Sequence, residues 1–491
     1  MAASQKFLVM LVLQTGVVMW TIAMFLRSMI LVSAIVGSLP AQILSEVRPS
    51  PQQLAWQDLE IGVLIHFGPN TFMDREWGDG TADPEVFNPA QLDPEQWVRA
   101  AKSAGAKYLI MVAKHHDGFC LWPSILTSYS VANSPWRGGR GDLVRDVESA
   151  TRKHGLKLGL YLSPWDRHEP SYRDNQEYDR YYVKQLEELV TRYGEITEFW
   201  LDGAGSEGHV YDFDRYVTEL RTFQPNTLVF ADVGFLKYGD IRWVGNESGL
   251  ALEENWNVID RLGYQRYRPA EADTPLRRDH WFWHPDDEKS LKSLEDLLDT
   301  YHKTVGRGAQ LVLGLAPDKR GLLPTSDESR LREFGEALTR VYANNLARLN
   351  WHVQGFEEAL DGDPDTFWSA PVEARHATID VVFQKPVAFD RTVTMEWLNE
   401  GQVIQKYAVE ALVGEKWGQL HVGGSVGHKK IDIFPLTTAT RVRLRILSSS
   451  GTPRIREFQI YNGATFNSSE LRMSRDAPNY RPMSISLVAG R

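Results

Sequence analysis

Short runs of β-forming apolar residues alternate with longer amphipathic stretches between Trp56 and Leu346. The short runs have the length of buried strands, and the longer stretches repeat their apolar positions every three to four residues, as helices do. We expect strands over residues 61–67, 108–115, 157–163, 196–202, 227–232, 241–245, 280–284 and 310–315. Helices are expected near residues 94–105, 142–154, 175–193, 212–223, 290–305 and 325–342.

This alternation predicts an α/β fold, a TIM-like (β/α)₈ barrel over residues 54–346. Strands that are separated by helices pair in parallel through right-handed crossovers, and eight of them in a segment of this length are typical of the barrel. The connection between the fifth and sixth strands is too short for a helix, so we expect an irregular region there. The alternative is a doubly wound open sheet, but no glycine-rich phosphate loop follows the first strand.

The pattern changes after Leu346. Residues 351–462 lose the helical periodicity and alternate in short strands separated by turn residues, which predicts a C-terminal β-sandwich domain packed against the barrel. Examples are the stretches 378–383, 407–413 and 441–446. The tail 464–491 has no periodicity, and we expect it to be disordered.

The N-terminal segment 1–41 is a candidate targeting signal. Apolar residues fill 8–26, Arg27 interrupts them, and a second apolar run ends before Ala41. The segment is therefore either a signal anchor or a cleaved export signal, and we favour the export signal because the second run has the layout of one. Either form predicts a secreted, extracellular or periplasmic location for the folded part.

Composition narrows the function classes. The 491-residue chain has a net charge of −10, so it carries no electrostatic footprint of nucleic-acid binding. It contains 16 Trp residues, and flat aromatic faces stack well on sugar rings. Cys120 is the single cysteine, which excludes an intrachain disulfide and a zinc site made of cysteines.

Polar and aromatic side chains gather where the predicted strands end, which is the face of a barrel that carries chemistry. The most telling one is Asp202, because the run Phe199–Gly203 places a carboxylate where a strand gives way to a loop. The other strand ends and the loops that follow them supply His66, Glu76, Trp77, His115, His116, Tyr161, Trp200, Glu247 and Trp281.

Several chemistries are open to this set of residues. His66, His115, His116 and Asp202 could bind a metal ion, but adjacent His115 and His116 should point to opposite sides of a continuing strand. A Ser-His-Asp triad lacks a Gly-x-Ser-x-Gly motif. The remaining possibility is a pair of carboxylates in an aromatic pocket that binds hydroxyl groups. Glycoside hydrolysis requires such a pair.

The sequence resembles the α-L-fucosidases of glycoside hydrolase family 29, and most of all the branch that acts on α-1,3/1,4-linked fucose. The matching stretches are HFGPNTF with EWG, AKHHDGFCLWPS, GLYLSPWDRHE, FWLDGA, RWVGNESG and WFWH, which span about residues 54–346 in order. The resemblance implies a (β/α)₈-like barrel, no cofactor and no metal ion, and hydrolysis of terminal fucose from oligosaccharides or glycoproteins.

The resemblance also implies roles for single residues. Asp202 matches the nucleophile and Glu247 the acid/base of a retaining mechanism, with Glu253 and Glu254 as the rival acids. Such a mechanism needs the two carboxyl groups roughly 5–5.5 Å apart, with one ionised and the other protonated. The positions that hold the fucose match His66, Glu76, Trp77, His115, His116, Tyr161, Trp200 and Trp281, with Trp283 as the reserve for Trp281.

The C-terminal segment resembles the discoidin-type (F5/8 type C), galactose-binding-like sandwich, on its stretches 359–363, 366–368 and 455–461. The resemblance leaves open whether this domain supports the barrel or binds a second sugar, and it makes a structural calcium ion one expectation. The alternatives to a fucosidase are a fucose-binding, lectin-like protein on an inactive barrel and a hydrolase of another terminal sugar. The expected partner is a fucosylated glycan, without nucleic acid, and with a membrane only if the N-terminal segment stays as an anchor.

Overall fold

The computed structural model describes residues 47–203, 206, 208–231, 239–258, 265–349 and 355–463. The N-terminal segment 1–41 and the tail 464–491 lie outside these ranges, as does most of the connection between the fifth and sixth strands. Within the described ranges, no helix has both the length and the apolar character that crossing a membrane requires.

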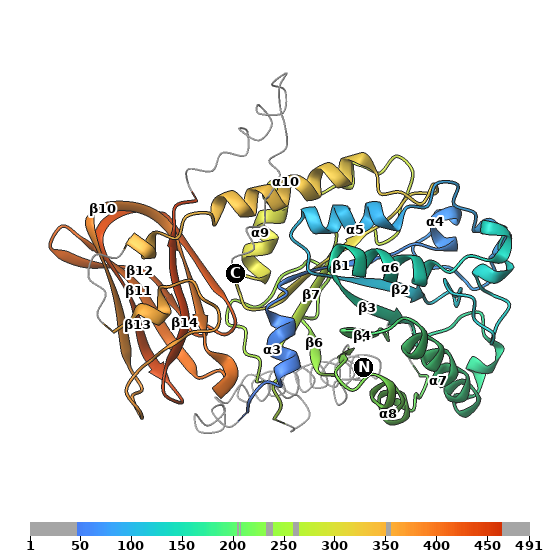
Figure 1. The fold of residues 1–491 in the computed structure, drawn as a ribbon, viewed down its shortest axis with the longest axis horizontal. Coiled ribbons are helices and arrows are strands. Elements are labelled where there is room, and N and C mark those ends of the chain that lie inside the picture. The colour runs from blue at the N-terminus through green and yellow to red at the C-terminus, as the bar shows by residue number, and fades with distance from the viewer. Residues whose placement is uncertain are drawn as a thin grey trace, which may run out of the picture.

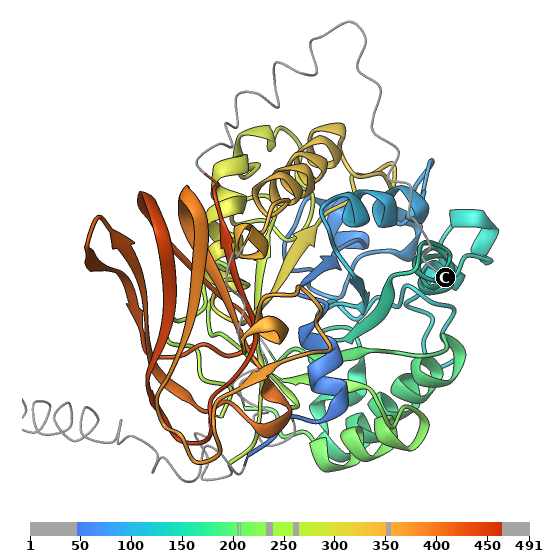
Figure 2. The ribbon, with the colours of Figure 1, turned by 60° about the vertical axis from the view of Figure 1, so that its left-hand side comes forward.

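Eight parallel strands close into a barrel, seen on the right of Figure 1 and from another side in Figure 2. Each strand pairs with the next one along the chain, and the eighth pairs with the first. The strands are β1 (Ile61–Ile65), β2 (Tyr108–Lys114), β3 (Lys157–Leu162), β4 (Glu198–Leu201), β5 (Leu228–Ala231), β6 (Ile241–Trp243), β7 (Ala270–Pro275) and β8 (Gln310–Leu315). The predicted (β/α)₈ barrel is confirmed.

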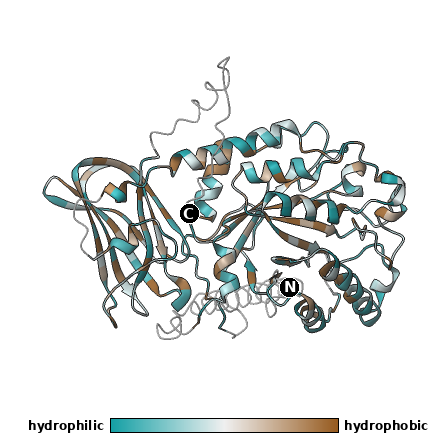
Figure 3. Ribbon diagram, in the orientation of Figure 1, coloured by the Kyte–Doolittle hydropathy of each residue, from teal (hydrophilic) through white to brown (hydrophobic). Residues whose placement is uncertain are grey.

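Amphipathic helices cover the outside of the barrel, and Figure 3 shows hydrophilic and hydrophobic residues alternating along them. Their first turns are fixed by side chains that accept backbone N–H groups, such as Asp93, Asp142 and Asp174 at three of the helices. The helices are α3 (Pro51–Gln57), α4 (Pro69–Met73), α5 (Pro94–Ser103), α6 (Leu143–His154), α7 (Asn175–Arg192), α8 (Phe213–Phe223), α9 (Leu294–Thr304) and α10 (Thr325–Val341).

The seventh strand is not where the sequence predicted it. The prediction chose the aromatic run 280–284, but that run is a loop, and β7 is Ala270–Pro275. This strand contains two carboxylic acids and ends in proline, so its sequence has the polarity of a turn. It forms a strand because Glu271 and Asp273 are buried inside the barrel, where each accepts a hydrogen bond from an aromatic side chain.

The interior of the barrel below the strand ends is filled by large side chains. Trp56 of α3 enters from one end and donates its Nε1–H to Glu198 Oε2 (2.8 Å), and Trp200 donates its Nε1–H to Oε1 of the same carboxyl group (2.7 Å). Trp200 also stacks on Phe230 at a ring-centroid distance of 3.8 Å. This packed layer leaves room for a ligand only above it, at the carboxyl ends of the strands.

The C-terminal domain is an antiparallel β-sandwich with its own apolar core, as predicted. Its strands are β9 (Trp368–Ser369), β10 (Ala377–Glu396), β11 (Ile404–Val413), β12 (Lys416–Gly423), β13 (Lys430–Ser449) and β14 (Arg454–Tyr461), in the order β12-β11-β13-β10-β14-β9. Register shifts between β10 and β13 interrupt their pairing, and shifts of this kind bend long strands.

The two domains pack closely against each other, as the sequence predicted (Figures 1 and 2). Arg456 of β14 forms an ion pair with Asp58 (2.7 Å), and Lys429 pairs with Glu60 just before β1. Met395 and Ile431 of the sandwich belong to the apolar cluster of the barrel. The sandwich is therefore fixed beside the amino-terminal end of β1, away from the carboxyl ends of the strands.

Candidate active site

A cavity opens among the carboxyl ends of the barrel strands. Its empty space is about 380 Å³ including the open mouth. The lining residues are Leu64, His66, Trp77, His115, His116, Tyr161, Trp200, Asp202, Glu247, Asp273 and Trp281. With the exception of Glu76, every residue that the sequence predicted for the site lines this one cavity.

Asp202 follows directly after β4, so the strand fixes its position at the edge of the barrel. Tyr161 of β3 donates its hydroxyl hydrogen to Asp202 Oδ2 (2.8 Å), and His116 Nε2 lies 3.7 Å from the same oxygen. The side chain keeps 25% of its surface exposed. A carboxylate that is oriented by a hydrogen bond and open to a cavity is suited to attack a bound ligand.

Glu247 approaches the cavity from the loop after β6. The side chain of the preceding Asn246 accepts the backbone N–H of Ser248 (3.1 Å), which holds the loop in a tight turn. Trp281 donates its indole N–H to Glu247 Oε2 (3.2 Å). Glu247 is exposed at the mouth, whereas Asp202 lies deeper, so the two carboxyl groups face the cavity from different strands.

The rival acids lie elsewhere. Neither Glu253 nor Glu254 lines the cavity that holds Asp202. The backbone carbonyl of Glu253 accepts a hydrogen bond from Lys430 (2.6 Å), and the Glu254 carboxylate lies against Gly424 of the C-terminal domain. Among these three glutamates, the geometry therefore favours Glu247.

His115 and His116 both face the cavity, as predicted for the site, because the strand does not continue through them. Strand β2 ends at Lys114, and a turn follows in which the Gly118 N–H donates to the carbonyl of His115 (3.0 Å). Gly118 has a φ of +87°, which side chains with a Cβ rarely adopt. The turn brings the two imidazole rings within 4.2 Å, measured between their centroids.

The three histidines of the cavity are neutral at ordinary pH. Burial lowers the pKa of His66 and His115 well below the usual range, and it lowers that of His116 to about 3. Within the described ranges, Nδ1 of His66 and Nδ1 of His115 are buried without a hydrogen-bond partner. Both rings also line the cavity, so they can offer a nitrogen to a polar ligand such as a sugar hydroxyl.

The arrangement of acidic and histidine side chains also tests whether the cavity could bind a metal ion. Among the residues that the structure describes, no three His, Cys, Asp or Glu side chains are grouped in a way that could hold a metal ion. His116 Nδ1 is already engaged with the hydroxyl of Ser163 (2.7 Å). The histidines of the cavity are thus arranged to form hydrogen bonds.

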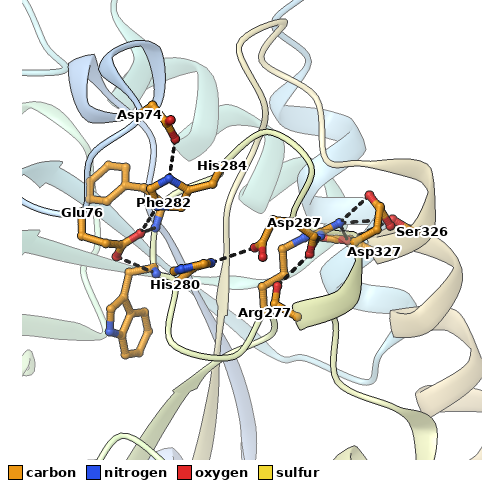
Figure 4. A network of polar contacts seen from close by, with 12 residues as sticks. Asp74, Glu76, Arg277, His280, Phe282, His284, Asp287, Ser326 and Asp327 are labelled. Atoms are coloured by element: carbon orange, nitrogen blue, oxygen red, sulfur yellow. Dashed lines mark hydrogen bonds and ion pairs between the residues drawn. The ribbon is translucent and has the colours of Figure 1, made fainter.

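Glu76 is not among the residues that line the cavity, and it holds the loop that carries Trp281 (Figure 4). Its carboxylate accepts the backbone N–H of Trp281 (2.8 Å) and that of Phe282 (3.2 Å), and it lies 2.6 Å from His284 Nε2. Asp74 binds the other nitrogen of that ring. The predicted contact of Glu76 with the sugar stays a prediction. Its hydrogen bonds to the loop that carries Trp281, in contrast, are present in the structure.

Three tryptophans line the cavity. Trp77 is 50% exposed at the mouth and meets His116 edge to face, with 5.5 Å between the centroids. Trp281 packs beside His66 at 5.1 Å, while Trp200 lies on the floor. The choice of Trp281 over Trp283 for the pocket fits the structure, because Trp283 is not a lining residue.

Comparisons with known proteins agree with this geometry. Residues 82–342 match the family model "Alpha-L-fucosidase", and residues 344–458 match the F5/8 type C domain. Alpha-L-fucosidase 1 of Arabidopsis thaliana is 36% identical, with 87% of this chain and 90% of that protein covered. The chain belongs to the α-L-fucosidase family, glycoside hydrolase family 29.

Solved structures of fucosidases and their relatives have the same architecture. A glycoside hydrolase 29 family member from an unknown rumen bacterium is 35% identical, with a TM-score of 0.75 over 85% of this chain and 77% of that one. A glycoside hydrolase 29 fucosidase of Ruminococcus gnavus in complex with fucose is 28% identical, with a TM-score of 0.78 over 87% of this chain and 97% of that one. The fucosidase described here thus shares its fold with these enzymes over both domains.

The sequence did not single out Asp273 of the fucosidase, although it lines the cavity together with Asp202 and Glu247. Trp243 donates its indole N–H to Asp273 Oδ1 (2.6 Å). Leu64 was also missed, because it lies inside a strand that looks entirely structural. The one sequence signal for Asp273 is that two acids lie close together in the same short segment. That signal becomes meaningful only once the segment is known to be a strand of the barrel.

Proposed function

We propose that this α-L-fucosidase works by a retaining mechanism, with Asp202 as the nucleophile and Glu247 as the acid/base. The observation that carries the proposal is the placement of these two carboxyl groups on one cavity with three neutral histidines and three tryptophans. A retaining glycosidase needs a nucleophile on one side of the anomeric carbon and a proton donor beside the leaving oxygen.

In the first step, a carboxylate oxygen of Asp202 attacks the anomeric carbon of fucose while the bond to the leaving oxygen breaks. Glu247 gives its proton to that oxygen, so the glycan leaves as an alcohol and a covalent fucosyl-enzyme remains. The hydroxyl of Tyr161 steadies Asp202 through the bond to Oδ2. In the second step, the Glu247 carboxylate takes a proton from water, which attacks the same carbon and releases fucose and free Asp202.

The neutral histidines and the tryptophans would bind the sugar itself. His66 and His115 line the cavity and can bond to hydroxyl groups, and Trp281 offers an apolar surface beside His66 for the C5 methyl group. A sugar that lacks one of these hydroxyls leaves a buried polar group unpaired, which costs about 1–3 kcal/mol. Selectivity for terminal fucose follows.

We also propose α-1,3/1,4-linked fucose on branched oligosaccharides or glycoproteins as the substrate. Glu247 lines a second, wider hollow of about 790 Å³ including its mouth, together with Ser248, Thr274, Pro275, Arg278, Asp279 and Lys292. Because the acid must touch the glycosidic oxygen, the departing sugar lies on this side of Glu247. The size and polarity of the hollow support a branched glycan. The apolar run at residues 8–37 supports export from the cytosol.

Azide rescue tests the two catalytic roles separately. Asp202→Ala should lose fucosidase activity and, with azide and fucosyl fluoride, form fucosyl azide of inverted configuration. Glu247→Ala should form fucosyl azide of retained configuration, because azide then replaces the water of the second step. Glu253→Ala is the matched control and should behave as the wild type. Rescue of neither variant, or the same product from both, would contradict the assignment.

Linkage is tested on natural glycans. The proposal predicts fucose release from a Lewis-type trisaccharide and little from an α-1,2-fucosylated one. Equal release from both would overturn the linkage proposal while leaving the fucosidase activity in place.

A further inference from the structure

A third carboxyl group faces the cavity. Asp273, the fourth residue of β7, is only 5% exposed and lines the same hollow as Asp202 and Glu247. Its Oδ1 accepts the indole N–H of Trp243 at 2.6 Å, which fixes the side chain and leaves Oδ2 available to the cavity. The mechanism above gives this group no role.

The surroundings of Asp273 are negative. Asp202 faces it from β4 and Glu247 from the loop after β6, and Glu271 lies two positions earlier on β7. His66, which lines the same cavity, is neutral, and in the described part of the chain neither lysine nor arginine lines this cavity. A second full negative charge beside Asp202 would therefore be both buried and unpaired, which proteins avoid by binding a proton.

Burial raises the pKa of Asp273 to about 7, against the opposing effect of the Trp243 hydrogen bond, and the charges of Glu247 and Asp202 raise it as well. The neutral acid has an O–H group to donate, while its other oxygen keeps the bond from Trp243. A nucleophile that must stay ionised next to an acid that stays protonated is a recurring arrangement in active sites.

We propose that Asp273 binds the substrate as a neutral carboxylic acid and donates a hydrogen bond from Oδ2 to a hydroxyl group of the fucose. Asp273 is then a substrate-binding residue of the fucosidase, and Asp202 carries the single negative charge of the inner pocket. The inference rests on the proposed role of Asp202. Loss of the proton from Asp273 removes the donor and adds a charge that repels the sugar oxygens.

The test compares Asp273→Asn, which keeps a neutral donor, with Asp273→Ala, which keeps none. The substrate is fucosyl fluoride, whose fluoride leaves without a proton from Glu247, so that the alkaline side of the pH profile does not report on Glu247. At pH 5.5, kcat/KM should fall about 3- to 10-fold in Asp273→Asn and about 30- to 100-fold in Asp273→Ala. The wild type should lose kcat/KM above about pH 7, and Asp273→Asn should not.

Several results would overturn the proposal. An Asp273→Asn protein as slow as Asp273→Ala at pH 5.5 would mean that the ionised group is an acceptor. An unchanged loss above pH 7 in Asp273→Asn, or an Asp273→Ala protein within twofold of the wild type, would also refute it. Asp299→Asn, an exposed acid on α9, is the matched control for the loss of one carboxylate.

Monodeoxy fucosyl fluorides give a second test on the wild-type protein, which holds even if the variants fail to fold. The sugar that lacks the bonded hydroxyl should lose the fall in kcat/KM above pH 7 that the others keep. If every deoxy sugar keeps that fall, the proposal fails. Azide rescue at Asp202 and Glu247 is independent of Asp273, so a failure of the proposed mechanism is recognised separately.

Discussion

Tyr161 shows how a single residue positions the proposed nucleophile. Its hydroxyl donates to Asp202 Oδ2 (2.8 Å), and its ring lies parallel to that of His115 with 6.1 Å between the centroids. A hydrogen bond to a carboxylate favours the ionised form over the protonated one. Tyr161 thus orients Asp202 in a pocket whose histidines carry no charge.

Tyr161→Phe should lower kcat/KM about 10- to 100-fold, because the lost bond ends on a charged group and is worth about 1.5–3 kcal/mol. The acid side of the pH profile should move to higher pH, since the Asp202 carboxylate loses a donor that favours ionisation. The measurement is kcat/KM for an aryl fucoside between pH 3.5 and 7. An unchanged acid side would show that the bond does not act on Asp202. Tyr211→Phe, outside the cavity lining, serves as the control.

At the scale of single residues, the sequence predicted which residues form the site better than it predicted which way their side chains point. Asp202 and Tyr161 were found because strand ends locate the chemistry of a barrel. The direction of His115 and His116 could not be read from the sequence, since it depends on where β2 stops and on the turn that Gly118 permits. Asp273 was missed because its neighbours in space come from other strands.

The loop after β7 is the element that completes the cavity. Glu76 holds the backbone of Trp281 and Phe282, and His284 lies between Glu76 and Asp74 (Figure 4). Burial by itself lowers the pKa of His284, but the hydrogen bonds to Glu76 and Asp74 raise it above the usual 6.5. The charged cluster therefore stabilises the fold fully below about pH 6.5, and its contribution is lost as the pH rises through the folded-state pKa.

Glu76→Gln should consequently lower the melting temperature more at pH 5.5 than at pH 9. It should also lower kcat/KM, since the loop that carries Trp281 loses one of its two acceptor oxygens. Thermal unfolding of the variant and the wild type at both pH values gives the comparison, with the exposed Glu85→Gln as the control. A loss of stability that is equal at pH 5.5 and pH 9 would contradict the ionic role of His284.

Elements with regular apolar patterns were predictable, and β7 was not. Strands such as β2 are buried along their whole length, so their sequences are continuous apolar runs. β7 is buried as fully but carries Glu271 and Asp273, which only the barrel interior can accommodate. The aromatic run 280–284 has the composition of a strand, yet its residues are held as a loop by Glu76.

At the scale of the whole molecule, ionic contacts join the sandwich to the barrel. Burial raises the pKa of Glu60, but Lys429 and His428 outweigh it and lower the pKa to about 2. The ion pair between Glu60 and Lys429 therefore adds stability above about pH 4.5, and this is lost as the pH falls towards 2.

Lys429→Met should lower the free energy of unfolding by about 1–3 kcal/mol at pH 7, because it leaves the largely buried Glu60 without its partner. The difference from the wild type should shrink as the pH approaches 2. Lys303→Met removes an exposed pair with Asp299 and should cost at most about 0.5 kcal/mol. Chemical denaturation of the three proteins decides this, and equal effects of both substitutions would contradict a role for Lys429 at the domain interface.

The covalent fucosyl-enzyme is the most direct test of the whole account. A 2-deoxy-2-fluoro fucosyl fluoride should react with the enzyme and stay attached, because the fluorine at C2 slows both steps while the fluoride leaving group keeps the first one fast. Digestion and mass spectrometry should then find the sugar on the peptide that contains Asp202, and the Asp202→Asn protein should stay unlabelled. A label on another carboxylate, or none in an enzyme that hydrolyses fucosides, would contradict Asp202 as the nucleophile.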